Sequence, residues 1–318
     1  MENAKIKTIV LMRGNVGEEV ANLKKALVKT LGKDASVYTG LANGEEFDAD
    51  TETALRAWQS SVGLVADGIA GPRTLSALEI LPPAELAVSV DTALVCRLFP
   101  FTKTSNIAKN LPYVTAALAA FDLTDADIIS VALGTIRAET EGFVPIAELP
   151  SHFNTLPGQA AFSAYEHKLG NTNPGDGARY RGRGYVQLTG RANYEKFGKV
   201  LDISLLDNPD SACAPEVAGC LLAAYLNANR GKLSEALADD DLKAARRIVN
   251  GGSHGLDRFS ETFRMAQKEF TTAATPLVGA VAKTAAPTGR GLSVVGLVRL
   301  RPRDEGGRIV GDRQAVLT

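Results

Sequence analysis

The amino-acid sequence predicts a mainly α-helical protein in which a small three-helix module is joined to a larger helical domain with long loops. Three observations lead to this fold class. The chain has 318 residues, a length typical of about two domains. Apolar residues recur at steps of three and four in several segments, which is the period of a helix. A Pro pair, Pro82-Pro83, separates these two parts because it cannot continue a helix.

The three helices of the first module are expected within residues 1–80. The first helix carries a stripe of four apolar residues: Val16, Val20, Leu23 and Leu27. The second covers residues 51–61 and also has one apolar face. Gly68 and Gly71 then lie in a turn, and Pro72 begins the third helix, since Pro at the first helical position loses no hydrogen bond.

Residues 81–95 are interpreted as a linker, and residues 96–272 as the second domain. In this domain one helix is expected to begin with Thr124 as its N-cap and to end at Gly142. Its buried stripe consists of apolar residues at helical spacing: Ile128, Ile129, Ala132, Leu133 and Ile136.

Two further helices are expected later in the chain. Pro215 begins the first of them, and residues 234–249 form the second. Residues 150–186, in contrast, are polar and rich in Gly. Because long structureless loops in compact domains are often functional, this segment is a candidate for a binding or catalytic role.

Residues 273–318 differ from both domains in composition. They begin rich in Ala, Thr and Pro, and from Pro287 onward they carry six Arg and three acidic residues, a charge of +3. One expectation is a solvated tail, and another is a tail that weakly contacts an anionic wall or membrane surface. A short hairpin that turns at Gly306-Gly307 is a third possibility, and the role of this tail stays open.

Composition argues against several classes of function. The formal net charge is −1 and residues 1–280 contain no long basic block, so nucleic acid is not expected as a partner. No apolar run reaches the ~18 residues of a membrane helix, so stable membrane insertion is not expected either. The first 15 residues lack the features of a secretory signal. We therefore expect a protein made in the cytoplasm that reaches any outside target by another route.

Cysteine and histidine residues do not indicate a metal site. They are sparse and lack zinc-ligand spacing: Cys96, Cys213, Cys220, His152, His167 and His254. The cysteines are expected to be small buried residues. We expect neither a metal nor an organic cofactor.

Glu139 is the first candidate for chemistry. It lies in the last turn of its predicted helix, three residues after Ile136 of the buried stripe. Burial and the partial negative charge of a helix C-terminus both disfavour the ionised form. A carboxylic acid that stays protonated can protonate a leaving oxygen in glycoside hydrolysis. The alternative is a structural Glu in a salt bridge with Arg137 or a distant Arg.

Glu148 is the candidate for a second carboxylate. It follows Gly142 and Pro145 on a loop or short strand, so a chain reversal can place it across a cleft from Glu139. A separation of roughly 6.5–9.5 Å between the carboxylates gives inversion, and about 5–5.5 Å gives retention. Glu141 is a rival, but two residues along a helix from Glu139 its side chain should point away.

Residues 181–194, with the sequence RGRGYVQLTGRANY, form the third candidate region. Gly182 and Gly184 allow the backbone to approach another group closely. Several side chains suit sugar hydroxyls or sugar faces: Gln187, Thr189, Asn193, Tyr185 and Tyr194. Thr189 is also the expected N-cap of the following helix. The alternative is a Gly-bearing turn followed by an ordinary cap.

Three segments of the second domain resemble glycoside hydrolase family 19, which includes plant-type chitinases and many phage endolysins. They are IRAETEGF (136–143), GNTNPGDGARYRGRGYVQLTGRANY (170–194) and RRIVNGG (246–252). The resemblance spans about residues 97–272 and implies a lysozyme-like helical hydrolase domain.

This resemblance also implies roles for individual residues. Glu139 matches the general acid, Glu148 the base that activates a water, and Thr189 the group that helps to position that water. Three polar residues match sugar-binding positions: Gln187, Asn193 and Asn250. The family often has His before the acid, whereas this chain has Ala138, and Arg137 is the expected substitute.

The first module resembles the type 1 peptidoglycan-binding domain family. The matching segments are GNVGEEVANLKKAL (14–27) and DADTETALRAWQSSVGLVADGIAGPRTLSAL (48–78). The resemblance implies that this module binds the bacterial cell wall through a groove near the turn DGIAG (67–71).

Together the two resemblances imply an endolysin that hydrolyses peptidoglycan glycan strands. It would cut the β-1,4 bond between N-acetylmuramic acid and N-acetylglucosamine by an inverting mechanism, as a monomer, in the periplasm after its release. Three alternatives stay open: a chitinase, an antibacterial effector directed at the wall, and a wall-binding protein without activity.

Overall fold

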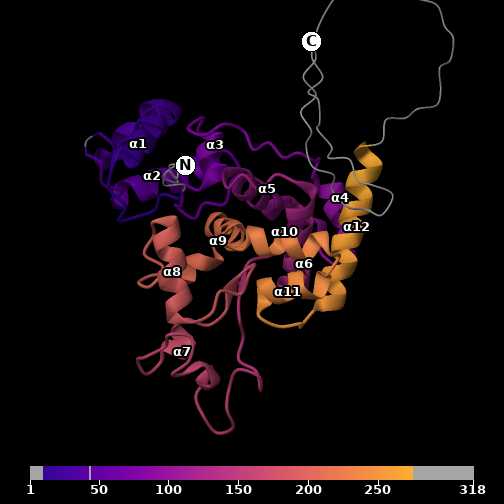
Figure 1. The fold of residues 1–318 in the computed structure, drawn as a ribbon. Coiled ribbons are helices and arrows are strands. Elements are labelled where there is room, and N and C mark those ends of the chain that lie inside the picture. The colour runs from indigo at the N-terminus through magenta and orange to yellow at the C-terminus, as the bar shows by residue number, and fades with distance from the viewer. Residues whose placement is uncertain (1–9, 43, 275–318) are drawn as a thin grey trace, which may run out of the picture.

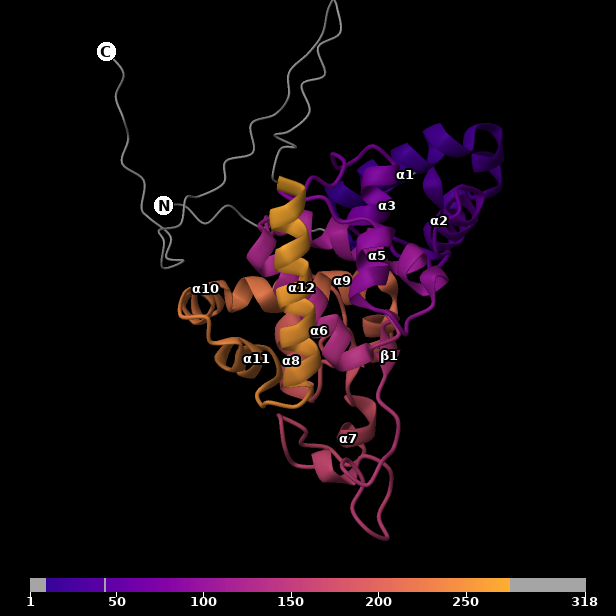
Figure 2. The ribbon, with the colours of Figure 1, turned by 90° about the vertical axis from the view of Figure 1, so that its right-hand side faces the viewer.

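The computed structural model describes residues 10–42 and 44–274 of the chain. Helices dominate this part, and its strands form one two-stranded sheet. Figure 1 shows the first module beside the larger domain, and Figures 1 and 2 both show the segment around α7 (Asp176–Arg179) extending beyond the packed helices. The predicted fold class, mainly α with long loops, is confirmed.

The first module contains three α-helices and two short 3-10 helices. They are α1 (Glu18–Leu31), η1 (Gly32–Val37), η2 (Thr39–Leu41), α2 (Ala49–Ser61) and α3 (Pro72–Ala77). Pro72 begins α3 as predicted. Val16 departs from its prediction, because it precedes α1 and is 71% exposed. Gly17, with a φ of 141°, separates it from the helix.

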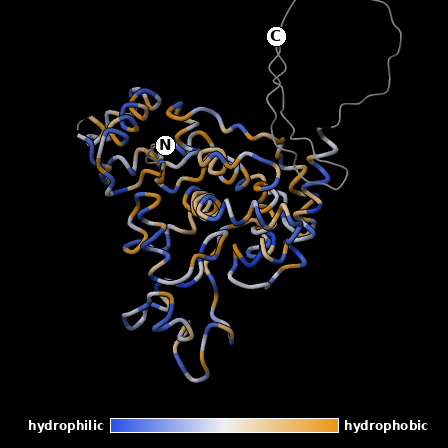
Figure 3. The backbone as a smooth tube through the Cα atoms, viewed as in Figure 1, coloured by the Kyte–Doolittle hydropathy of each residue, from blue (hydrophilic) through white to orange (hydrophobic). Residues whose placement is uncertain are grey.

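The larger domain begins with α4 (Thr92–Leu98), α5 (Thr104–Ala120), α6 (Ala126–Thr140), β1 (Ile146–Ala147), η3 (Ser163–Tyr165), α7 and β2 (Arg183–Gly184). It continues with α8 (Arg191–Leu201), η4 (Pro209–Cys213), α9 (Pro215–Ala228), α10 (Arg230–Ala238), α11 (Leu242–Asn250) and α12 (Leu256–Ala274). Figure 2 shows α12 lying along α6, and Figure 3 shows hydrophobic residues gathered on α9. Among the described helices, none combines the length and hydropathy that a membrane span requires.

Helix α6 carries Glu139 and runs through the core. Its residues from Ile128 to Ala138 are buried on all faces, so the predicted stripe is confirmed. The predicted N-cap is wrong by one residue, because Asp125 accepts the Ile128 N–H at 2.9 Å and caps the helix instead of Thr124. Asp caps as effectively as Thr, so the helix begins at the later of two suitable residues. The helix ends at Thr140, two residues before the predicted Gly142.

Strands β1 and β2 bring the two candidate regions of the sequence together. They pair antiparallel, with Ile146 opposite Gly184 and Ala147 opposite Arg183. Glu148 follows β1 directly, and its N–H donates to the carbonyl of Gly182 at 2.8 Å. This short sheet therefore holds Glu148 beside the start of the RGRGYVQLTG segment.

The later helices differ from prediction in one place. Pro215 begins α9 as expected, but residues 234–249 form parts of two helices, α10 and α11, rather than one. The break lies at Asp240, whose φ is 52°, and Asp241 then caps α11 by accepting the Ala244 N–H at 2.8 Å. Residues 273 and 274 end α12, and the predicted hairpin or tail beyond them lies outside the described residues.

The predicted linker lies against the larger domain. Ala87 donates its N–H to the carbonyl of Thr124 at 2.9 Å, and Leu86 and Val88 pack against the main apolar core. Helix α4 begins at Thr92, inside the predicted range of residues 81–95.

The turn DGIAG lies at the contact between the two domains. Ile69 is 6% exposed and clusters with apolar residues of the larger domain. Glu216 of α9 is fully buried and accepts the backbone N–H of Thr74 at 2.7 Å and that of Arg73 at 3.3 Å. A Cβ on Gly71 would lie 2.5 Å from a Glu216 oxygen, so the close approach requires glycine there. The wall-binding groove that we expected near this turn is therefore not open at the turn itself.

Candidate active site

An open cleft with a volume of about 690 Å³ collects most of the predicted site residues. They come from the end of α6, the segment after β1, the turn after β2, the start of α8 and the end of α11: Glu139, Glu148, Gln187, Thr189, Asn193 and Asn250. Segments more than 100 residues apart in sequence thus form one site, with the two predicted carboxylates in the same cleft.

Glu139 occupies the last turn of α6, as predicted, and its side chain is 13% exposed. Its Oε1 accepts from a guanidinium nitrogen of Arg246 at 2.6 Å and from the amide of Asn250 at 2.8 Å. The Arg246 side chain is fully buried. The salt bridge to a distant Arg, which was the alternative to a catalytic role, is therefore present, and Glu139 also lines the cleft. Its Oε2 has no hydrogen-bond partner among the described residues.

Helix α11 supplies both partners of Glu139. Arg246 and Asn250 are four residues apart, so they lie on the same face of this helix. Arg246 is further held by its Nε–H, which donates to the carbonyl of His254 at 2.9 Å, and its guanidinium lies 5.9 Å from the Phe259 ring centre. Sequence reasoning identified Asn250 but missed Arg246. The four-residue spacing within RRIVNGG is the signal that could have found it.

Glu148 is held by neutral donors. Its Oε1 accepts from the Tyr165 hydroxyl and from the Asn154 amide, both at 2.8 Å, and its Oε2 accepts from the Gly182 N–H at 3.2 Å. Burial, and then the contact with Glu148, raise the pKa of Tyr165 above its usual value. Tyr165 and Asn154 belong to the long polar segment whose functional role was predicted without naming residues.

Three side-chain oxygens converge above the backbone of Gly182. A Cβ on this glycine would lie 2.7 Å from Gln187 Oε1, 3.1 Å from Glu148 Oε2 and 3.3 Å from Thr189 Oγ1. The Gln187 amide nitrogen donates to the carbonyls of Gly184 and Ile146, which fixes the orientation of this side chain. Because Gly182 has no side chain, these three side chains can approach its backbone closely.

The local backbone here differs from the predicted extended segment. Gln187 has a φ of 49°, so it lies in a turn that returns Leu188 to pair with Arg183. Gly190, not Thr189, is the N-cap of α8, and its φ of 89° suits glycine. The Thr189 hydroxyl donates to the carbonyl of Gln187 at 2.8 Å instead. The Asn193 amide donates to the carbonyl of Thr189 at 2.8 Å and so stabilises the turn.

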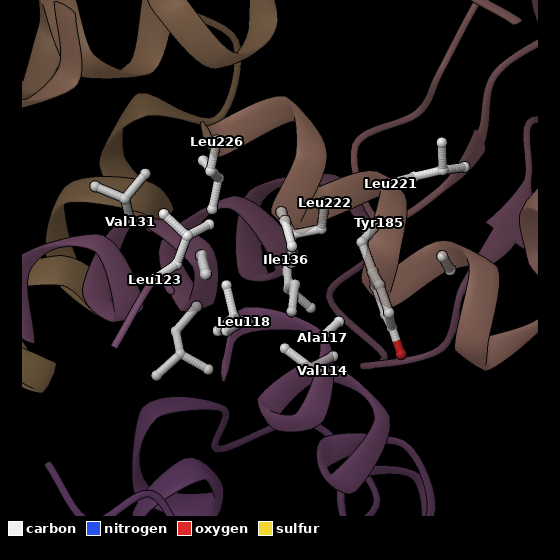
Figure 4. Close-up of a cluster of buried hydrophobic side chains, with 14 of the residues drawn as sticks. Val114, Ala117, Leu118, Leu123, Val131, Ile136, Tyr185, Leu221, Leu222 and Leu226 are labelled. Atoms are coloured by element: carbon white, nitrogen blue, oxygen red, sulfur yellow. The ribbon is translucent and has the colours of Figure 1, made fainter. Parts of the chain in front are cut away.

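The two aromatic predictions in this segment are wrong. Tyr185 and Tyr194 are both fully buried, so neither presents a ring to a sugar in the cleft. Figure 4 shows Tyr185 among apolar core side chains such as Ile136. The Tyr194 hydroxyl donates to the carbonyl of Arg181 at 2.9 Å. Tyr194 lies on the buried face of α8, and Tyr185 follows β2 and packs into the main apolar core.

Glu141 points away from the cleft, as predicted. Its carboxylate accepts from Arg137 at 2.6 Å and from Arg258 at 3.3 Å, and Arg137 lowers its pKa. The expectation that Arg137 substitutes for a missing His beside Glu139 is therefore wrong, because Arg137 pairs with Glu141. No cluster of three or more His, Cys, Asp or Glu suited to a metal ion occurs within the described part of the chain.

Comparisons with known proteins bear on both domains. Residues 16–78 match the family model described as "Putative peptidoglycan binding domain". A Haemophilus influenzae protein described as a glycosyl hydrolase family 19 domain-containing protein is 33% identical over 115 residues, which are 35% of this chain and 54% of that protein. The amidase CwlM of Mycobacterium tuberculosis, an N-acetylmuramoyl-L-alanine amidase, is 43% identical over 65 residues, 20% of this chain and 14% of that protein.

Among solved structures, chitinase C from Streptomyces griseus HUT6037 is similar with 23% identity and a TM-score of 0.41, covering 57% of this chain and 77% of that one. The aligned part of this chain thus spans about half the length of the Haemophilus relative and a small part of CwlM. The resemblances to family 19 and to the peptidoglycan-binding domain are confirmed.

Proposed function

We propose that this protein is a glycoside hydrolase that cuts peptidoglycan glycan strands at the β-1,4 bond between N-acetylmuramic acid and N-acetylglucosamine. The observation that carries the proposal is one open cleft lined by Glu139, Glu148 and Thr189. The relation to a family 19 protein supports the reaction class, and the match of residues 16–78 supports the wall as substrate. Such an activity suits an endolysin of the phage type.

In the proposed mechanism Glu139 is the general acid. Its Oε1 is held by Arg246 and Asn250, so the proton to be donated lies on Oε2. This proton passes to the glycosidic oxygen as the bond from that oxygen to the anomeric carbon breaks. Negative charge develops on Glu139 at the same time, and the fixed guanidinium of Arg246 stabilises it.

Glu148 is the proposed base. The attacking water would lie between Glu148 Oε2 and the Thr189 hydroxyl, since both side chains line the cleft. Its oxygen forms the new bond to the anomeric carbon on the face opposite the leaving group, and Glu148 accepts its proton. The product then has an inverted anomeric configuration, provided that the carboxylates are about 6.5–9.5 Å apart.

Digestion of purified peptidoglycan sacculi tests this proposal. After borohydride reduction, mass spectrometry should find the reduced form of N-acetylmuramic acid at the new chain ends, and NMR should show the inverted anomer first. Glu139→Gln should abolish the release of these ends while the variant still sediments with sacculi. Reduced N-acetylglucosamine at the ends, or ends released only from purified chitin, would contradict the proposed substrate bond. Equal release by the variant would contradict the role of Glu139.

A further inference from the structure

Phe153 is an exposed aromatic residue at the edge of the cleft. Its side chain is 83% exposed, and it lines the cleft beside Glu148 and Ser151. Ligand-binding clefts are commonly lined by aromatic side chains together with a few polar groups, and Phe153 beside Glu148 fits this pattern. The buried Tyr185 and Tyr194 leave the cleft without the aromatic surface predicted for them.

The turn that carries Phe153 is fixed to the proposed base. The Ser151 N–H donates to Asn154 Oδ1 at 2.8 Å, and the Thr155 N–H returns to the carbonyl of Ser151 at 2.9 Å. The amide of Asn154 then donates both to Glu148 Oε1 and to the carbonyl of Leu149, each at 2.8 Å. Phe153 therefore has a defined position relative to the Glu148 carboxylate.

A neighbouring ring supports Phe153. The centre of the His152 ring lies 3.8 Å from that of Phe153, with an angle of 41° between the planes. Tyr165, another aromatic residue that lines the cleft, is not equivalent, because it is less exposed and its hydroxyl is bonded to Glu148. Phe153 thus offers the more accessible ring on this side of the cleft.

We propose that Phe153 is a platform on which one pyranose ring of the glycan strand stacks, on the Glu148 side of the cleft. The inference rests on the proposed function. A β-linked pyranose presents C–H groups on its faces, and these pack against the electron-rich face of an aromatic ring. Because Asn154 connects the same turn to Glu148, a sugar on Phe153 is also placed in register with the base.

Kinetics on peptide-free glycan strands test the platform. Phe153→Ala should raise KM about threefold to tenfold, the range of one aromatic contact, and change kcat by less than about twofold. Phe153→Tyr should restore KM, because it retains the ring. Phe101→Ala is the matched control, since Phe101 is 84% exposed and does not line the cleft. An unchanged KM in Phe153→Ala would overturn the proposal.

A binding measurement separates this proposal from the proposed function. Trp58, the single Trp of the chain, is buried in the first module with 4% of its surface exposed. A Trp introduced at the cleft would therefore be the one whose fluorescence responds to a sugar bound there. In a Glu139→Gln background, Phe153→Trp should show a saturable fluorescence change with a tetrasaccharide of alternating N-acetylglucosamine and N-acetylmuramic acid. Phe101→Trp in the same background should not show this change.

The two measurements give distinct outcomes. If the unmodified protein cuts no glycan but Trp at position 153 responds to the tetrasaccharide, the proposed function fails and the platform stands. If the protein cuts glycan while the fluorescence and KM stay unchanged, the platform fails and the proposed function stands.

Discussion

The two sides of the cleft hold their carboxylates in different ways. Glu139 ends a long buried helix and contacts the fully buried guanidinium of Arg246. Glu148 follows a two-residue strand and contacts a phenol, an amide and a backbone N–H. One side thus provides a fixed positive charge, and the other provides neutral donors.

This difference corresponds to the charge that each group gains or loses. In the proposed mechanism Glu139 becomes an anion as its proton leaves, and a fixed cation stabilises that change. Glu148 accepts a proton and loses its charge, and a fixed cation beside it would oppose that change. Neutral donors can orient Glu148 without adding a full charge. Substitutions of Arg246, Gly182 and Tyr165 each alter one side of the cleft, with expected effects on turnover that decrease in this order.

The largest effect is expected from Arg246→Met, which removes the cation and keeps a side chain of similar length. Turnover on sacculi should fall about 100-fold or more, because the charge that develops on Glu139 loses its partner. The free energy of unfolding in urea should fall by about 3 kcal/mol, since a buried ion pair is broken. Arg258→Met is the control: Arg258 pairs with Glu141 but is 54% exposed, so the loss should stay below about 1 kcal/mol. Unchanged turnover in Arg246→Met would show that the cation has no catalytic role.

Gly182→Ala tests the space beside Glu148. Its methyl group would meet the oxygens of Gln187, Glu148 and Thr189 and would displace the side chains proposed to hold the water. Turnover should fall roughly 100-fold, the scale that a misplaced reacting group commonly costs. Gly231→Ala in α10 is a matched control, because no atom lies within 4 Å of its added Cβ. Equal turnover by Gly182→Ala and Gly231→Ala would show that the attacking water is not held beside Gly182.

Tyr165→Phe removes one neutral donor from Glu148. We expect kcat to fall about tenfold, from the loss of one hydrogen bond to a charged group, with KM nearly unchanged. Tyr113→Phe is the control for the same chemical change, since the Tyr113 hydroxyl accepts from the Val65 N–H at 2.8 Å and Tyr113 does not line the cleft. A loss of stability with an unchanged kcat would indicate a structural role only.

The sequence predicted one side of this cleft better than the other. Glu139 was found because it ends a regular helix with a buried stripe, and Asn250 because the segment RRIVNGG resembles family 19. Asn154 and Tyr165 were missed because they act from a long irregular segment, where spacing along the chain gives no direction in space. Arg246 was missed for another reason: an ion pair between residues 107 apart depends on how α6 and α11 pack.

Glu216 is a third carboxylate that can be compared with Glu139 and Glu148, because it is fully buried and contacts only neutral donors. It accepts from the backbone of Arg73 and Thr74 where the two domains meet. Burial raises its pKa to about 7, and the buried Asp67 carboxyl nearby adds to this shift. Between about pH 4.5 and 7 the folded protein thus retains a proton that the unfolded chain releases. Stability should therefore fall as the pH rises through this range and should level off above it.

Glu216→Gln tests whether this carboxyl causes the decline. In the unmodified protein, Glu216 should lower the free energy of unfolding by about 3 kcal/mol as the pH rises from 4.5 to 7. Urea unfolding at several pH values should measure this decline. The variant should lose most of this slope, because Gln has no proton to release, and its turnover should stay near that of the unmodified protein. Glu235→Gln, an exposed position on α10, should keep the slope. If the free energy of unfolding of Glu216→Gln still falls between pH 4.5 and 7, another group causes the pH dependence. Asp67 would then be replaced first, because burial raises its pKa as well.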